Sequence, residues 1–406
     1  MIYLTVLFLL ILLVYHYDYQ GHKKWRLEWY LLCGVIFICV SGLRYRLGID
    51  STRYEYSFPS MPTLLQLGSI NNDDTRYGPA YILLTAIARS VSNKFVVLQF
   101  LHAIFFNFFI FYFFFKNTKH IFSALFLYGI LTYFNYNFEI LRESCAIAVF
   151  LFSWKYFKSN NWGKYYLCCF IAILFHPSAL FLTILPLFYL PIFRKFFKIG
   201  WTFGITSGIV FIASSIIAVK FFDYIRLISL ASIEDYANIY ENSSLSQSKS
   251  LNIIGIMTFF IRSIIYPVGI ILLFKGSNSH KPEIKAVKET NAKLEYLVCW
   301  FIYISIMTLY IKLFYRFNNY LYPFWILIMT DVIFTKIHYR QKFKKLSFGL
   351  WGIIITPYLL LSSYAYFSDD TGSGINLIKR YLPYASVLDP YRDEQRERLF
   401  YYLGGG

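Results

Sequence analysis

Residues 95–115 read FVVLQFLHAIFFNFFIFYFFF, a stretch of 21 residues without a single Asp, Glu, Lys or Arg. A helix needs about 20 mostly apolar residues to cross the hydrocarbon core of a bilayer. This stretch therefore predicts a membrane-spanning helix. Similar apolar runs recur along the whole chain. The candidate spans are 1–16, 27–43, 78–92, 95–115, 121–135, 138–157, 164–175, 177–193, 199–219, 252–274, 296–312, 320–335 and 347–365.

The composition of the 406 residues excludes an ordinary soluble protein. Hydrophobic residues make up 57% of the chain and charged residues 15%, whereas soluble domains average about 45–50% and about 25%. The chain is therefore predicted to be all-α, a polytopic transmembrane helical bundle of about 11–13 spans. Segment 78–92 is short and carries Arg89, so we expect it to be re-entrant or interfacial rather than a full crossing.

The domain organisation follows from the interruptions between these runs. We predict one transmembrane domain over 1–365 with extracytoplasmic loops at 44–77 and 220–250, followed by an extracytoplasmic C-terminal tail at 366–403. The three glycines at 404–406 are interpreted as a cloning scar. The segments between spans are too short for a soluble nucleotide-binding domain, which excludes an ATPase with a cytoplasmic catalytic domain.

The net charge of +17 fits a membrane protein better than a nucleic-acid-binding one. Lysine-rich segments such as 155–164 and 275–293 are expected on the cytoplasmic side, because basic loops resist translocation. Anionic membrane lipids are the expected partners of this charge, and no nucleic acid is expected. The six cysteines lie in apolar stretches without CxxC spacing, so neither a metal, another cofactor nor a disulfide framework is predicted.

Arginines gather on the opposite side, in segments that are not lysine-rich. A cluster of cations facing away from the cytoplasm runs against the usual bias, and a guanidinium binds phosphate through two parallel hydrogen bonds. We therefore expect these arginines to meet a diphosphate. They are Arg44, Arg46, Arg53, Arg76, Arg142, Arg226 and Arg316.

Arg142 is the most informative of these arginines, because it stands at the mouth of an apolar helix. An intramembrane charge costs about 2.5–3.5 kcal/mol on insertion scales, so it indicates function by default. Glu139 and Glu143 flank Arg142 and are candidates to orient it. The alternative is a local Arg–Glu pair that only stabilises the helix end.

His176 stands between two apolar segments and is followed by Pro177, which breaks the helix and frees backbone groups. Irregular backbone at membrane depth is tolerated where it lines a cavity, and a neutral imidazole can move a proton. His176 is therefore a candidate base. The alternative is a histidine whose hydrogen bonds are satisfied at the tip of a helical hairpin.

The first external loop places Asp50 within reach of Arg44, Arg46 and Arg53. An aspartate beside cations ionises readily and can act as a base or orient an arginine. Tyr54, in the same loop, could stack on a sugar ring. The alternative is a merely solvated loop.

Two further acidic clusters invite a metal assignment, Asn71–Asp74 and Asp369–Asp370. Neither offers enough spaced oxygen ligands to enclose a cation. We interpret both as solvated loop acids.

Four short motifs, in this order, make the chain resemble the EpsG family of Wzy-like bacterial polysaccharide polymerases. The family's Arg-x-x-x-Gly-x-Asp-x-x-x-Tyr, Arg-Gln-x-x-Ala, Phe-His-x-Ser-Ala and Arg-x-x-x-Tyr motifs correspond in turn to Arg44–Gly48–Asp50–Tyr54, Arg142–Ala146, Phe175–Ala179 and Arg316–Tyr320. Glu143 replaces the usual glutamine. Order and spacing agree across about 44–320.

The resemblance implies an enzyme that joins oligosaccharide repeat units carried on undecaprenyl diphosphate. The growing glycan would pass from its lipid diphosphate to a hydroxyl of the next unit, at the outer face of the bacterial inner membrane. The implied fold is a helical bundle of the kind found in GT-C-type lipid-dependent glycosyltransferases, working without metal. A chain-length regulator protein is an expected partner.

The residues suit that reaction. Arg142, Arg316 and either Arg44 or Arg46 are assigned to the diphosphate, with Arg53, Tyr54 and Tyr320 as further substrate contacts. Asp50 or His176 is the general base, and the sequence leaves this choice open. Glu139 or Glu143 would orient arginines.

Three other functions fit part of the pattern. A lipid-linked oligosaccharide flippase would need charges spread through the bundle and often shows repeat symmetry between its halves, whereas here the charges gather at one face. Another GT-C-type glycosyltransferase or an O-antigen ligase would share this architecture, and only substrate tests separate them. A non-enzymatic scaffold would not need arginines and a histidine at helix breaks.

Overall fold

The computed structural model describes residues 2–69, 77–227, 253–278, 285–338, 356–363, 367 and 374–403. Their contacts divide the chain into two compact units, 1–183 with 337–406 and 184–336. Each unit is described by itself. Several segments named above lie outside the described residues. They are 228–250 of the predicted loop 220–250, most of 366–373 including Asp369–Asp370, Asn71–Asp74, and 404–406.

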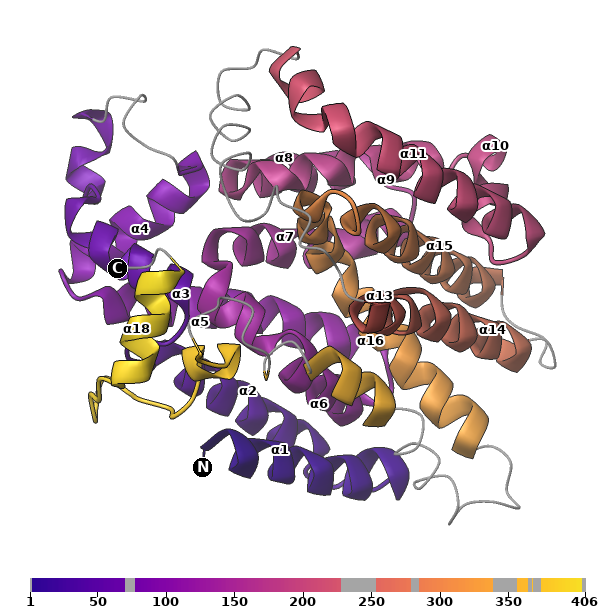
Figure 1. Ribbon diagram of the computed structural model, residues 1–406. Helices are drawn as coiled ribbons and strands as arrows, with labels where there is room; N and C mark the ends of the chain where they lie inside the picture. The colour runs from indigo at the N-terminus through magenta and orange to yellow at the C-terminus, as the bar shows by residue number, and fades with distance from the viewer. Residues whose placement is uncertain are drawn as a thin grey trace. The chain divides into compact units, whose positions relative to one another are not determined.

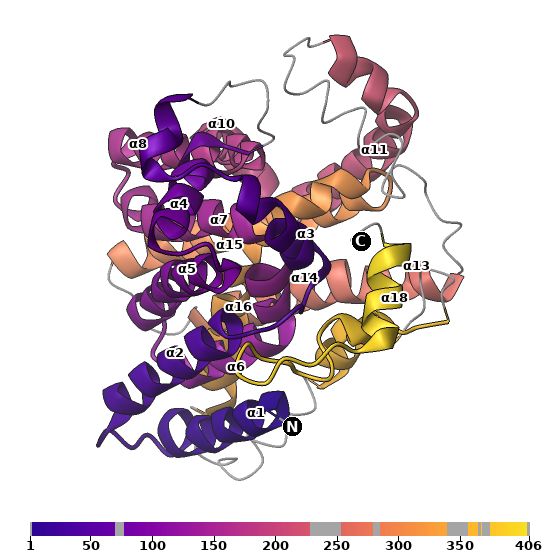
Figure 2. The same cartoon turned by 90° about the vertical axis from the view of Figure 1, so that its left-hand side faces the viewer.

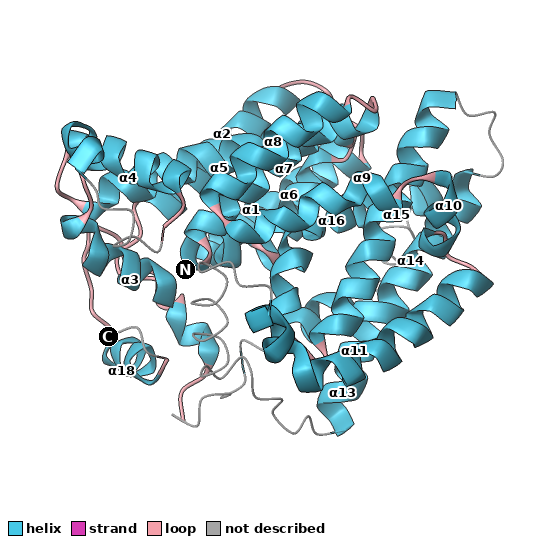
Figure 3. Ribbon diagram, turned by 90° about the horizontal axis from the view of Figure 1, so that it is seen from above, coloured by secondary structure: helices cyan, strands magenta, loops and turns pink. Residues whose placement is uncertain are grey.

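The described residues are helical and form no strand, which confirms the all-α prediction (Figure 3). Strand-like pairing in these residues is limited to two isolated antiparallel bridges, Arg44 with Ser386 and Ser386 with Asp389.

The first unit consists mainly of apolar helices that pack side by side (Figure 1). Helix α5 lies against α2, α4 and α7, while α8 packs on α7 and α4, and α1 on α6. Its main helices are α1 Ile2–Leu13, α2 Arg26–Gly42, α3 Ile49–Ser57, α4 Pro79–Val91, α5 Phe95–Asn117, α6 Ile121–Leu131, α7 Leu141–Lys158, α8 Trp162–Phe175 and α18 Glu394–Tyr402. Shorter turns of π- or 3₁₀-helix occupy Val14–Tyr19, Phe58–Ser60, Leu64–Ser69, Asn135–Glu139, Pro177–Ile184 and Leu377–Arg380, and 356–363 is also helical.

The second unit is also helical. Helix α15 packs against α11 and α14. Aromatic side chains pack together in this unit. Trp300 lies edge-on to Phe188, and its ring centre is 4.9 Å from that of Phe197. Its elements are α9 Leu185–Phe188, α10 Pro191–Arg194, the 3₁₀ turns Lys195–Phe197 and Lys312–Phe314, α11 Trp201–Leu227, α13 Ile253–Phe260, the π-turn Ile261–Ile265, α14 Tyr266–Asn278, α15 Lys285–Thr308 and α16 Tyr315–His338.

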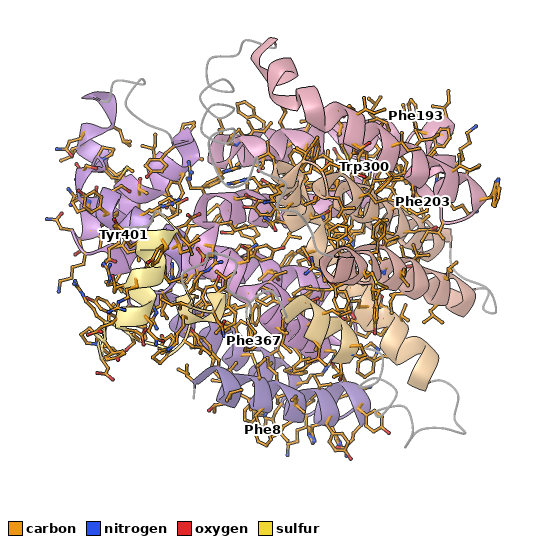
Figure 4. All side chains as sticks on the ribbon, viewed as in Figure 1. Phe8, Phe193, Phe203, Trp300, Phe367 and Tyr401 are labelled. Atoms are coloured by element: carbon orange, nitrogen blue, oxygen red, sulfur yellow. The ribbon has the colours of Figure 1, made fainter. Side chains whose placement is uncertain are left out.

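Large apolar side chains lie exposed along one stripe of several helices. On α1, Leu4 and Phe8 are 69% and 61% exposed, while Leu10 and Leu13 are buried, and Phe8 stands on the outer side of α1 in Figure 4. Water would penalise such a surface, whereas lipid tails accept it. The exposed stripes therefore belong to a membrane protein.

Fewer helices than predicted are long enough to span a membrane by themselves. In the described part of the chain these are Ile2–Tyr19 and Phe95–Asn117, and a third is reached if Pro177–Phe188 and Pro191–Phe197, bent by 96°, count together. The bend divides the apolar run 177–193 into two short helical pieces, where prolines cannot continue a straight helix. The single span over 177–193 stays a prediction. The figure of 11–13 spans and the single domain over 1–365 stay predictions.

Arg89 lies in an apolar helix, where nearby backbone oxygens and an aromatic ring bind its guanidinium. From α4 its guanidinium donates to the carbonyl oxygens of Pro59 (2.8 Å) and Met61 (3.3 Å) and lies over the ring of Phe58. Arg89 therefore holds the loop after α3 against α4. The re-entrant or interfacial position of 78–92 stays a prediction.

Candidate active site

The first predicted motif folds into a short helix whose N-terminus is capped by a carboxylate. Gly48 turns the chain with φ +85°, and α3 follows at once. Oε2 of Glu139 accepts the backbone N–H groups of Ile49 (3.0 Å) and Asp50 (3.2 Å). A carboxylate at this position satisfies two N–H groups that a helix leaves open and complements its dipole. Glu139 thus fixes the start of the helix that carries Asp50.

Replacement of Gly48 by alanine is expected to destabilise this site. A Cβ at Gly48 would lie 2.3 Å from the backbone oxygen of Phe138, and a side chain in this backbone conformation costs about 1–3 kcal/mol. We expect a lower thermal midpoint of the purified protein and little polymer. Gly68→Ala is the matched control, since nothing lies within 4 Å of its Cβ position. A Gly48→Ala protein as stable as Gly68→Ala would contradict the packing described here.

The second motif meets the first through Arg142. Nε of Arg142 donates to the hydroxyl of Tyr54 at 2.9 Å. The guanidinium carbon also lies 4.9 Å from the ring centre of Tyr77 and 5.8 Å from that of Tyr54. Aromatic faces attract cations, and Arg142 is only half-buried. Its guanidinium is therefore oriented by two tyrosines.

The third motif, at the end of α8, packs next to Tyr54 of the first motif and contacts the start of α4. Phe175 packs against the buried cluster of Tyr54, Tyr81 and Leu141. A Cβ at Gly78 would lie 2.3 Å from the backbone oxygen of Leu174, so only glycine permits this close approach of α4 to the end of α8. The structure therefore brings the first three motifs into one neighbourhood.

His176 is built into the turn that ends α8. It is 2% exposed, and its Nδ1 accepts the backbone N–H of Ser178 at 3.2 Å and lies 2.6 Å from the Ser178 hydroxyl. This geometry resembles that of the hairpin-tip alternative.

Asp50 lies on the more open side of the site. Its carboxylate is 37% exposed and sits 3.4 Å from the guanidinium of Arg53, which is 50% exposed. Asp50 precedes Arg53 and Tyr54 by three and four residues on α3, so it lies between the exposed Arg53 and the buried Tyr54. The carboxyl of Glu139 is 10% exposed, which leaves two carboxylates of different exposure at the start of one helix.

The other two arginines of the first motif are bound to protein groups. Arg44 has no exposed surface; it donates to the Ser41 carbonyl and, at 3.1 Å, to the Ser51 hydroxyl. Burial lowers the pKa of Arg44 to about 10, so it remains charged at neutral pH. Arg46 forms a two-bond pair with Glu397, at 2.8 and 2.7 Å. This pair lowers the pKa of the Glu397 carboxyl.

A family model covers most of the chain. The model of the EpsG family matches residues 27–386. The chain belongs to the EpsG family. This is a family of Wzy-like polysaccharide polymerases. Neither a curated protein nor a solved structure matches the chain.

The remaining predicted residues of this EpsG-family chain are less open. Glu143 is 1% exposed. Arg316 and Tyr320 lie on α16 of the second unit, where Tyr320 is fully buried. The fourth motif is therefore described apart from the other three. All site assignments in the chain stay predictions.

Four contacts of this site were not anticipated from the sequence: Tyr77, Arg380, Tyr381 and Glu397. Oε1 of Glu139 accepts the Tyr381 hydroxyl at 2.9 Å and lies 3.6 Å from Arg380, so Arg380 is the arginine that Glu139 contacts. The charged run 392–398 in the EpsG-family chain is a signal that could have pointed to the C-terminal contacts. No sequence pattern around Tyr77 indicates its contact with Arg142.

Proposed function

We propose that this chain polymerises oligosaccharide repeat units carried on undecaprenyl diphosphate, at the outer face of the bacterial inner membrane. The family supports a polysaccharide polymerase. The observation that carries the finer proposal is the position of Arg142, which two tyrosines orient beside the helix of Asp50. A fixed cation near a candidate base suits transfer from a diphosphate leaving group.

The diphosphate is assigned to the half-buried Arg142 and to Arg53, whose side chain is half-exposed. Charge builds up on the leaving diphosphate in the transition state, and fixed guanidinium groups stabilise it without having to reorganise. Arg44 and Arg46 are already bound to Ser51 and Glu397. We therefore assign these two to holding the loop, and keep Arg316 of the second unit as a further candidate.

Asp50 is the base in this proposal. Its carboxylate is 37% exposed, enough to reach a hydroxyl, and lies 3.4 Å from the guanidinium of Arg53. His176 is 2% exposed and bound to Ser178. We therefore assign His176 to the shape of the α8 turn.

The proposed step exchanges one carbon–oxygen bond for another and moves one proton. The acceptor hydroxyl oxygen attacks the anomeric carbon of the growing glycan, while the bond between that carbon and the diphosphate oxygen breaks. The electron pair of that bond leaves with the diphosphate, beside Arg142. Asp50 takes the hydroxyl proton.

Several finer features are part of this proposal. The active site faces the outside of a multi-pass protein of the inner membrane, and the bundle is of GT-C type and needs no metal. A chain-length regulator protein acts with it. The exposed apolar stripes on the helices support the membrane location, and the uneven distribution of lysine and arginine supports the orientation.

The test in cells is a lipid-linked glycan profile of a strain that lacks the protein. We expect loss of polymer and build-up of single repeat units on the outer leaflet, reversed by the wild-type gene. Build-up on the inner leaflet would identify a flippase instead. Unchanged polymer length would contradict the proposal.

A further inference from the structure

The C-terminal segment 374–403, here called the arm, returns to the first motif. In Figure 2 the yellow arm runs past α3 and α2. Its backbone is bonded to the stretch before α3, through Val387 N to Leu43 O (2.8 Å), Tyr45 N to Ala385 O (2.9 Å) and Gly48 N to Arg380 O (3.1 Å). The arm is therefore joined to the loop of the site along its length.

The end of the arm also accepts hydrogen bonds from two arginines of the first motif. On α18, both carboxylate oxygens of Glu397 accept from Arg46, at 2.8 and 2.7 Å. Beyond α18, the carbonyl of Leu403 accepts from Arg53 at 3.1 Å. Paired bonds between a guanidinium and a carboxylate fix both distance and direction. The position of Arg46 just before Gly48 makes this pair a fixed point at the entrance to α3.

Near its N-terminal end, the arm contacts Glu139, the carboxylate that caps α3. Tyr381 donates its hydroxyl to Oε1 of Glu139 at 2.9 Å, while Oε2 of the same carboxylate accepts the N–H groups of Ile49 and Asp50. The orientation of Glu139 thus links the arm to the backbone of Asp50.

Helix α3 needs such support because it is short. It has 9 residues, and isolated helices below about 12–15 residues are marginal in water. Its exposed side carries the Asp50–Arg53 pair, which contributes little by itself. Contacts from outside the helix must therefore keep it in place.

Helix α18 is not among the residues that the family model matches. The match ends at 386, and Glu397 lies beyond it. The arm thus supplies the carboxylate of Glu397, from outside the matched residues, to Arg46, which lies inside them.

We propose that the arm is a positioning element of the active site, and that Glu397 is a positioning residue that acts through Arg46 to keep Asp50 in place. This proposal rests on the proposed function. A shift of about 1 Å in a reacting group can cost a hundredfold in rate. Loss of the pair therefore lowers kcat more than it changes KM, because Asp50 on α3 reacts, whereas Arg142, which binds the diphosphate in this proposal, lies on α7.

The test compares Glu397→Gln with Glu394→Gln in the full-length protein in liposomes, with lipid-diphosphate-linked repeat units as substrate. Glu394 is on the same helix and exposed, so it is the matched control. We expect Glu397→Gln to lower kcat at least about tenfold with KM within about twofold, and Glu394→Gln to stay near wild type. Arg46→Ala and Glu397→Ala should not be additive. Wild-type kcat in Glu397→Gln, or an equal loss in Glu394→Gln, overturns the proposal.

A second measurement does not depend on activity. Amide hydrogen exchange of Ile49–Ser57 and Glu394–Tyr402 should rise in Glu397→Gln and stay unchanged in Glu394→Gln. Should the wild type form no polymer, the proposed function fails, and the exchange result still decides whether the arm holds α3. Unchanged amide exchange of Ile49–Ser57 in Glu397→Gln would show that the arm does not hold α3 in place, and would overturn the proposal.

Discussion

Arg142→Ala is expected to lower polymer formation about 10²–10³-fold, because removal of one fixed group that stabilises transition-state charge has this effect in other enzymes. The structure supplies the physical reason, since Tyr54 bonds to Nε and Tyr77 lies 4.9 Å from the guanidinium carbon. These contacts orient the charge before substrate arrives. The measurement is the initial rate of polymer formation from lipid-linked units, at matched protein levels.

Two control variants separate charge from fold. Arg398→Ala removes an exposed arginine on α18 and should leave the rate near wild type. Tyr54→Phe keeps the ring and removes only the hydroxyl bonded to Arg142, so a loss of about tenfold is expected, as for one hydrogen bond to a charged group. An Arg142→Ala protein that folds and polymerises at the wild-type rate would exclude Arg142 from the diphosphate site.

Asp50→Asn is expected to lower the rate about 10²–10⁴-fold, the usual contribution of a general base. Asparagine keeps the size of the side chain and leaves the backbone N–H that Glu139 accepts, so α3 should remain folded. His176→Ala should lower the rate less than about tenfold, because it removes contacts within a turn. Both rates are measured at matched expression.

The comparison of these two variants also decides the question that the sequence left open. A loss above a hundredfold in His176→Ala, with Asp50→Asn near wild type, would identify His176 as the base. A hydrogen-exchange profile of α3 in Asp50→Asn that matches wild type would exclude misfolding as the cause of its loss.

The sequence predicted the helical membrane class because apolar runs such as 95–115 carry their own signal. It did not predict the bend between Pro177–Phe188 and Pro191–Phe197. Prolines interrupt this apolar stretch, and packing rather than local sequence sets the direction of each short helical piece. The number of spans was harder to predict for the same reason. Run length in the sequence counts apolar residues, whereas a bend such as the one of 96° between Pro177–Phe188 and Pro191–Phe197 divides the helix that they form.

The sequence put Arg142 and Tyr54 on one predicted face of the protein. The structure joins them by a hydrogen bond, which no spacing rule indicates. The roles of Glu139 and Arg46 depend on partners far away in sequence. Glu139 caps α3 and meets Tyr381, and Arg46 meets Glu397. Such long-range pairs have no local pattern, so only the folded chain reveals them.

The most direct measurement is polymer formation by the purified full-length protein in liposomes that contain only single repeat units on undecaprenyl diphosphate. The account predicts a ladder of longer lipid-linked glycans with release of undecaprenyl diphosphate, and no ladder with Arg142→Ala. Repeat units that stay single in the presence of folded wild-type protein, or a ladder that Arg142→Ala makes equally well, would contradict it.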